Sequence, residues 1–169
     1  MVIYTIGHSN VDVEEITRLL KEYGIELVLD VRSSPYSRFS PQFNRETLAG
    51  SLREAGIEYA YAGHYLGGRP KDPHLYDGDK VDYTELEETG WYQEAIDGLI
   101  EVATEKWTVV VCAEEDPGRC HRHLLIAQTL LDRGIEVRHI RHRGGETWEE
   151  VAARKLEREV KQLPLFREE

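Results

Sequence analysis

Short apolar segments alternate with amphipathic segments along most of this chain, and this alternation restricts the fold more than any other feature. Strand-like apolar segments occur at residues 2–6, 26–30, 57–61, 107–112 and 135–140. Segments with the spacing of helices lie between them. Strands that alternate with helices are typical of a parallel sheet reached through right-handed crossovers. The sequence therefore predicts an α/β fold, a single-domain three-layer sandwich with a mostly parallel sheet of about five strands and helices on both faces.

The expected helices are marked by apolar stripes that repeat every three to four residues. The stripes lie within residues 13–23, 44–55, 91–104 and 124–131. Thr147 and Glu150 form a capping pair, which predicts one more, highly charged helix near the end of the chain. Residues 63–90 are rich in Gly, Pro, Asp and Tyr and show no clear periodicity, so we expect a functional loop there.

Length and composition indicate one intracellular domain. A chain of 169 residues with 40% hydrophobic content can bury one core, so we assign residues 1–160 to a single α/β domain and residues 161–169 to a tail. No apolar run is long enough to cross a bilayer, and we expect no membrane association. The two cysteines do not form a disulfide framework, which favours a cytoplasmic location.

The charge distribution limits the ways in which this chain can bind nucleic acid. A net charge of −11 excludes a protein that coats nucleic acid non-specifically, because that mode needs many Lys and Arg residues. Residues 138–143 nevertheless contain three arginines and two histidines. This stretch is a candidate local basic patch.

Chemically capable side chains follow the ends of three predicted strands. In open parallel sheets, ligands bind beyond the carboxyl ends of the strands. The residues that the sequence places there are His8, Ser9, Asp30, Arg32, Cys112 and Glu114. A carboxylate, an imidazole, a thiol and a guanidinium that converge from separate strands suit acid–base work on a polar or anionic substrate.

Several motifs in this order resemble one known family. They are Thr5-Ile6-Gly7-His8-Ser9, Asp30-Val31-Arg32 with Pro35 and Ser37, Leu66-Gly67-Gly68, Cys112-Ala113-Glu114 and Cys120-His121-Arg122. Together they are similar to the domain-of-unknown-function 488 family over residues 3–131. The resemblance implies a compact α/β domain in which these motifs lie together, and it leaves the reaction and the substrate open.

Glu114 and Asp30 are the candidate residues for activating water. If the strand alternation continues past Cys112, Glu114 points the same way as that thiol and shares a site with it. His8 or His121 would then transfer the proton. The structural alternative is that Glu114 or Asp30 only forms an ion pair with a nearby arginine.

Substrate or phosphate contacts are expected from a set of hydroxyl and guanidinium side chains. The set is Ser9, Arg32, Ser37, Arg38, Arg119 and Arg122. Residues 33–40 also contain Tyr36 and Phe39, which would stack on a base. The alternative is an ordinary turn-rich loop with an aromatic side chain tucked inward.

Cys112, Cys120 and His121 are the candidate zinc ligands, since thiolate and imidazole match the tetrahedral preference of this metal. Without a CxxC pair the spacing does not require a metal, and the sequence demands no cofactor. Cys112 is equally consistent with a buried structural cysteine.

The tail contains Gln162-Leu163-Pro164-Leu165-Phe166, which resembles the pentapeptide that binds the bacterial sliding clamp. That resemblance implies a partner-binding role for Gln162, Leu163, Leu165 and Phe166. The alternative is a tail that folds back on the domain.

The function we expect is that of an enzyme of nucleic-acid maintenance. It would process a nucleotide or a damaged or modified base, as a hydrolase with a carboxylate-activated water. Two alternatives remain: a thiol- or zinc-dependent enzyme acting on a small molecule, and a non-catalytic ligand-binding adaptor.

Overall fold

The computed structural model describes residues 1–145 and 149–157 of the chain. Its centre is a six-stranded sheet in the order β3-β2-β6-β1-β7-β8. The strands are β1 (Val2–Gly7), β2 (Leu27–Asp30), β3 (Glu58–Tyr61), β6 (Thr108–Cys112), β7 (Glu136–Arg141) and β8 (Glu149–Ala152). All neighbouring pairs are parallel except β7 and β8. The predicted mostly parallel α/β sandwich is confirmed.

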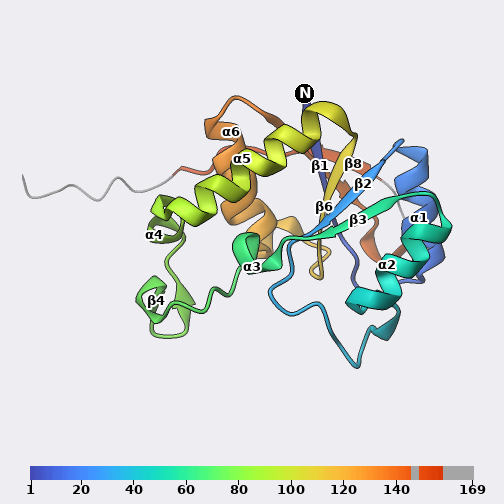
Figure 1. Ribbon diagram of the computed structural model, residues 1–169, viewed down its shortest axis with the longest axis horizontal. Helices are drawn as coiled ribbons and strands as arrows, with labels where there is room; N and C mark the ends of the chain where they lie inside the picture. Colours follow the sequence, from blue (N-terminus) through green and yellow to red (C-terminus); the bar gives the residue numbers. More distant parts are fainter. Residues whose placement is uncertain (146–148, 158–169) are drawn as a thin grey trace, which may run out of the picture.

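Helices cover both faces of the sheet, as Figure 1 shows. One face packs against α1 (Val13–Glu22) and α2 (Arg45–Glu54), and the other against α5 (Gly90–Glu105) and α6 (Gln128–Asp132). Strand β6 contributes side chains to the hydrophobic cores on both faces of the sheet. Successive side chains of a strand point to opposite faces, so Val109 and Val111 join the α1–α2 core while Val110 joins the α5–α6 core.

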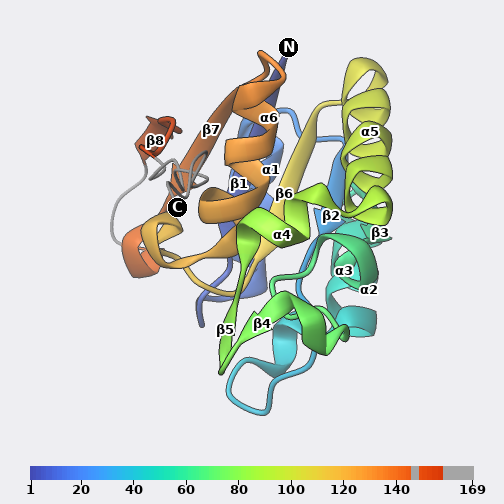
Figure 2. The same cartoon turned by 90° about the vertical axis from the view of Figure 1, so that its left-hand side faces the viewer.

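The region without periodicity is more ordered than a loop. It contains α3 (Gly63–Leu66), the 3-10 turn Pro73–Leu75, the short pair β4 (Tyr76–Asp77) and β5 (Lys80–Val81), and α4 (Tyr83–Glu88). Figure 2 shows these elements grouped at the end of the sheet where the parallel strands terminate. They form one side of the candidate site described below.

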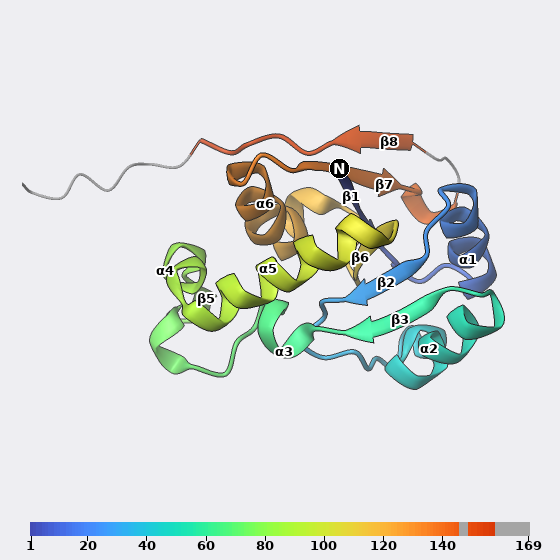
Figure 3. The ribbon, with the colours of Figure 1, turned by 45° about the horizontal axis from the view of Figure 1, so that its top comes forward.

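The predicted last helix is wrong, and this adds a sixth strand to the predicted five. Residues 149–152 form β8, which runs antiparallel to β7, as the opposed arrows in Figure 3 show. Glu150 forms an ion pair with Arg138 across the two strands, and Glu149 pairs with Arg143. Without β8, strand β7 would be an exposed sheet edge with unpaired backbone groups. Thr147 and residues 158–169 lie outside the described residues.

The predicted basic patch at residues 138–143 is not a free cationic surface. Arg138, Arg141 and Arg143 each form an ion pair with a glutamate. His139 and His142 are buried. The charge of this stretch is thus largely neutralised by its own neighbours.

Among the described residues, no helix combines the length and the apolar character needed to span a membrane.

Gly7 allows the loop after β6 to cross the end of β1. A Cβ added at Gly7 would lie 1.7 Å from the carbonyl oxygen of Glu114, which is a backbone atom that cannot turn away. We therefore expect Gly7→Ala to lower the free energy of unfolding by about 3 kcal/mol or more, as measured by urea denaturation.

The matched control for this prediction is Gly98→Ala, in helix α5, where an added Cβ meets no atom within 4 Å. Alanine favours a helix over glycine by about 1 kcal/mol, so we expect this variant to be as stable as the parent or slightly more so. A Gly7→Ala protein with the stability of the parent would contradict the close approach.

Candidate functional site

A cavity of about 750 Å³ opens at the carboxyl edge of the sheet. Its wall combines residues from the ends of β1, β2 and β6 with residues of the α3–α4 region and of the segment before α6. The lining residues are Ser9, Arg32, Ser33, Ser34, Gly68, Arg69, Tyr83, Cys112, Ala113, Glu114, Glu115, Arg119, Cys120 and His121. The structure thus has one of its cavities at the sheet edge where several of the candidate side chains lie.

Asp30 is fully buried, and its carboxylate oxygens are hydrogen-bonded to other groups of the protein. Its carboxylate accepts hydrogen bonds from the backbone, Nε and Nη2 of Arg32 at 3.1, 2.9 and 2.7 Å. The hydroxyl of Tyr59 donates a further bond at 2.6 Å. The ion pair fixes the Arg32 guanidinium at the cavity wall, and Asp30 itself does not line the cavity. This is the structural alternative stated for Asp30.

His8 supports the other side of the Arg32 guanidinium. Nε2 of His8 lies 3.1 Å from Nη1 of Arg32, and Nδ1 lies 2.6 Å from the carbonyl oxygen of Ser9. Since arginine only donates, Nε2 accepts and Nδ1 carries the proton. The ring stacks on Phe43 at 4.3 Å between centroids. Burial lowers the pKa of His8 to about 4, which keeps the ring neutral. His8 lies behind the cavity wall.

Arg122 holds the loop that forms the cavity wall after β6. This side chain is fully buried, and its guanidinium donates to the carbonyl oxygens of Glu114 and Glu115 and, at 3.2 Å, to Oγ1 of Thr5. Thr5 in turn bonds to His139. The predicted phosphate contact from Arg122 is replaced by these internal bonds, because the side chain points into the protein and away from solvent.

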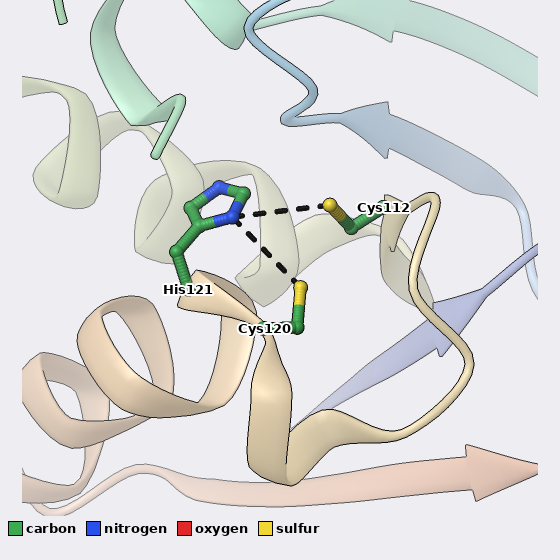
Figure 4. A group of neighbouring side chains, drawn as sticks. All are labelled: Cys112, Cys120 and His121. Carbon is green, nitrogen blue, oxygen red and sulfur yellow. Dashed lines mark hydrogen bonds between the residues drawn. The ribbon is translucent and has the colours of Figure 1, made fainter. Parts of the chain in front are cut away.

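Cys112, Cys120 and His121 form the chemical centre of the cavity. Cys112 ends β6, while Cys120 and His121 precede a π-helical turn at Arg122–Ala127. Nδ1 of His121 lies 3.8 Å from each sulfur, as Figure 4 shows. Both cysteines are free. The two sulfurs and this nitrogen all lie within 4.8 Å of one another.

The pKa values of the two thiols are shifted in opposite directions. A hydrogen bond from Cys112 lowers the pKa of Cys120, and the charge of Arg122 acts in the same direction. The same hydrogen bond and burial raise the pKa of Cys112. Cys120 is thus the more acidic thiol of the pair.

Glu114 and Glu115 are adjacent, but their surroundings differ. Strand β6 ends at Cys112, so Glu114 lies in the following loop with an exposed side chain at the cavity wall. Glu115 receives two bonds from Arg141, which lower its pKa to about 2. Glu114 is therefore the solvent-accessible carboxylate of the cavity, and Glu115 anchors the loop to β7.

Other predicted contact residues separate into two groups. Ser9 and Arg119 line the cavity, and Arg119 is highly exposed. Ser37 and Arg38 do not: Oγ of Ser37 accepts from the backbone of Phe39, and the Arg38 guanidinium lies over the exposed Phe39 ring at 5.1 Å. The loop after β2 therefore lines the cavity at its start, through Ser33 and Ser34, but not at Ser37 and Arg38. The predicted partner-binding residues Gln162, Leu163, Leu165 and Phe166 lie outside the described residues.

Sequence reasoning did not identify Arg69 and Tyr83 as cavity residues. Both lie within residues 63–90, where the sequence has no periodicity from which their position relative to the strands could be predicted. Gly68 was visible only as part of a motif, and its role is steric: an added Cβ would lie 2.8 Å from Cγ of His121. His123 is half-buried and His142 is buried.

The buried histidines predict an acid-sensitive fold. Burial lowers the pKa of His8 to about 4 and that of His139 to about 3, against an ordinary value of 6.5. Between these values the unfolded chain binds a proton that the folded chain does not, so stability falls as the pH falls from 6.5. We expect each histidine to remove about 2 kcal/mol between pH 7 and pH 5. Glu115 contributes nothing to this change, because its lowered pKa makes its contribution decline only below about pH 4.5.

The measurement is urea denaturation at both pH values for the parent and for His8→Gln. The difference between pH 7 and pH 5 should be smaller in the variant by about 2 kcal/mol, whatever its absolute stability. His74→Gln, at an exposed position, is the control and should keep the parental difference. A full parental pH dependence in His8→Gln would show that His8 does not resist protonation in the folded state.

Comparison with known families agrees with the motifs. The family model described as Domain of unknown function DUF488 matches residues 12–129, more than half of the chain. The matched range includes Arg32, Cys112, Glu114, Cys120 and His121, which all line the cavity. Neither the curated proteins nor the solved structures contain a significant match. The chain therefore belongs to the family described as Domain of unknown function DUF488.

Proposed function

We propose that this protein is a hydrolytic enzyme that acts on a nucleotide, or on a damaged or modified base, bound in the cavity at the carboxyl edge of the sheet. The observation that carries the proposal is the position of Glu114. Its accessible carboxylate shares one cavity with the Cys112, Cys120 and His121 cluster. A carboxylate beside such a cluster can take a proton from water while the water oxygen attacks the substrate.

The size and lining of the cavity support a polar, ring-sized substrate. A volume of about 750 Å³ falls in the usual range for small-molecule sites. Ser9 and Ser33 offer hydroxyls to sugar or base edges, and Arg69 and Arg119 offer positive charge for a phosphate. Arg32 adds a guanidinium whose position is fixed by Asp30.

Glu114 is a better candidate for the general base than Asp30. All the lone-pair directions that Asp30 could direct at a substrate are occupied by Arg32 and Tyr59. Glu114 is held through its backbone carbonyl by Arg122, which leaves the carboxylate directed by a fixed main chain. A fixed main chain with an accessible side chain is what a proton acceptor requires.

The nucleic-acid part of the proposal rests on the cavity and not on an extended basic surface. The arginines of residues 138–143 are paired with glutamates, so they offer little to a phosphate backbone. We therefore propose recognition of a single nucleotide or an extruded base, in which one unit enters the cavity. The free cysteines are compatible with the cytoplasm, which we propose as the location.

Replacement of the proposed base gives the direct test. Glu114→Gln keeps the size of the side chain and removes its proton affinity, so we expect turnover to fall at least about 100-fold with an unchanged circular dichroism spectrum. The assay is a panel of nucleotides and of single-stranded and duplex oligonucleotides with damaged or modified bases, scored for base release, hydrolysis and strand cleavage.

The control is Glu94→Gln, an exposed glutamate of helix α5 outside the cavity, which should retain parental turnover. Equal activity of Glu114→Gln and the parent would reject Glu114 as the base. Inactivity of the folded parent on the whole panel would reject the proposed substrate class.

A thiol-dependent enzyme acting on a small molecule is the second candidate. It is favoured by the placement of both sulfurs at 3.8 Å from one imidazole nitrogen on the cavity wall. In such an enzyme a cysteine, and not water, attacks the substrate. Trapping a covalent substrate adduct on Cys112 or Cys120 by mass spectrometry would favour this reading over hydrolysis by Glu114.

A further inference from the structure

We propose that Cys112, Cys120 and His121 bind one Zn²⁺ through their two sulfurs and Nδ1, with a fourth coordination position open to the cavity. The site deepens the proposed hydrolase and rests on it for its catalytic consequence. The binding itself rests only on the geometry of the three side chains. Figure 4 shows the imidazole directed at both sulfurs from one side.

The distances match a tetrahedral metal site. Zn–S bonds of about 2.3 Å and Zn–N bonds of about 2.0–2.1 Å imply S···N separations of about 3.6 Å at the tetrahedral angle. The two S···Nδ1 distances are both 3.8 Å. The two sulfurs lie within 4.8 Å of each other. An ion of this size therefore fits after small side-chain rotations.

The imidazole is held in the tautomer that a metal needs. Nε2 of His121 lies 2.9 Å from the carbonyl oxygen of Leu66 and 3.2 Å from that of Val31. A carbonyl only accepts, so Nε2 carries the proton and Nδ1 presents its lone pair to the sulfurs. Ligating histidines in proteins are oriented by such a backbone partner on the other nitrogen. Gly68 lies so close to this imidazole that an added Cβ would come within 3.0 Å of Nδ1.

The fourth position has access to solvent. All three ligands line the cavity, so a ligand can approach from that side. Two thiolates would balance the charge of the ion, and the backbone N–H of Arg122 donates to Sγ of Cys120 at 3.5 Å. Water in an open position on zinc ionises to hydroxide more readily than free water.

This site gives Glu114 a defined role. Water in the fourth position would transfer one proton to the Glu114 carboxylate, and its oxygen would form a bond to the electrophilic carbon of the substrate. The bond between that carbon and the leaving group would break, and the leaving group would take the proton from Glu114. No oxidant or reductant is required. A three-ligand site with one open position is the arrangement of catalytic zinc, whereas structural zinc has four protein ligands.

Metal content is the first measurement. The full chain is reduced, loaded with zinc, freed of excess metal by gel filtration and analysed by mass spectrometry of elements. We expect roughly one zinc per chain for the parent and for His74→Gln, the control with a histidine outside the cluster. Cys112→Ser, Cys120→Ser and His121→Gln should bind zinc at least about 100-fold more weakly in competition with a chromophoric chelator. A parent without zinc, or variants that keep it, would overturn the site.

Cobalt substitution makes the test independent of whether the variants fold. Co²⁺ added to the metal-free parent should give the intense visible bands of a tetrahedral site and a thiolate-to-metal charge-transfer band, both abolished by one equivalent of zinc. Weak octahedral absorption alone would overturn the assignment.

The activity assay separates the two proposals. Stoichiometric zinc without turnover on any substrate would leave the metal site standing and reject the hydrolase. Turnover that persists after complete removal of zinc by a chelator would retain the hydrolase and overturn the catalytic metal.

Discussion

The buried guanidinium of Arg122 is the interaction on which the arrangement of this site depends. It is fully buried, and it binds two successive carbonyl groups of the loop after β6 together with a hydroxyl of β1. A charge in such a place is tolerated only when its donors are satisfied, and here the loop carbonyls satisfy them. The loop conformation and the buried charge therefore require each other. Glu114 and the cysteine cluster take their positions from this mutual requirement.

A second buried pair performs a similar task on the opposite side. Asp30 binds Arg32 through three hydrogen bonds, and His8 contacts the same guanidinium from the end of β1. Because burial lowers the pKa of His8, the ring stays neutral beside the arginine instead of repelling it. The cavity thus has two cationic side chains behind or within its wall, and both are held in place by internal partners. Such fixed charges stabilise a developing anion without having to reorganise.

The sequence predicted the central sheet because its strands are short, apolar and punctuated by glycines. Residues 107–112 gave the clearest case, and β6 lies there with all its residues buried. Residues 149–152 were misassigned because their charges suit a helix in isolation, while pairing with β7 is a tertiary effect that local pattern does not contain. The short elements from α3 to α4 were missed for the same reason, because they are held by tertiary contacts with α5.

For the site, residue type and strand position predicted which side chains would gather at the sheet edge. They did not determine which would face the cavity. Asp30 and Arg122 carry the chemistry expected of a catalytic acid or a phosphate ligand, yet their donors and acceptors are consumed inside the protein. Glu114 keeps an exposed carboxylate, whereas the carboxylate of the next residue, Glu115, is bound by Arg141. Orientation at this scale is set by packing, and a single sequence shows packing poorly.

The π-helical turn at Arg122–Ala127 has a consequence for how the site is specified. In a regular helix each residue advances about 100° around the axis, and a π turn accommodates one more residue in the same length. If the same residues wound as a regular helix, the extra residue would rotate Cys120 and His121 by about 100° relative to the apolar face of α6 that packs on the sheet. The helical phase of this segment, more than the identity of any one of its residues, therefore determines whether the second cysteine and the imidazole meet Cys112.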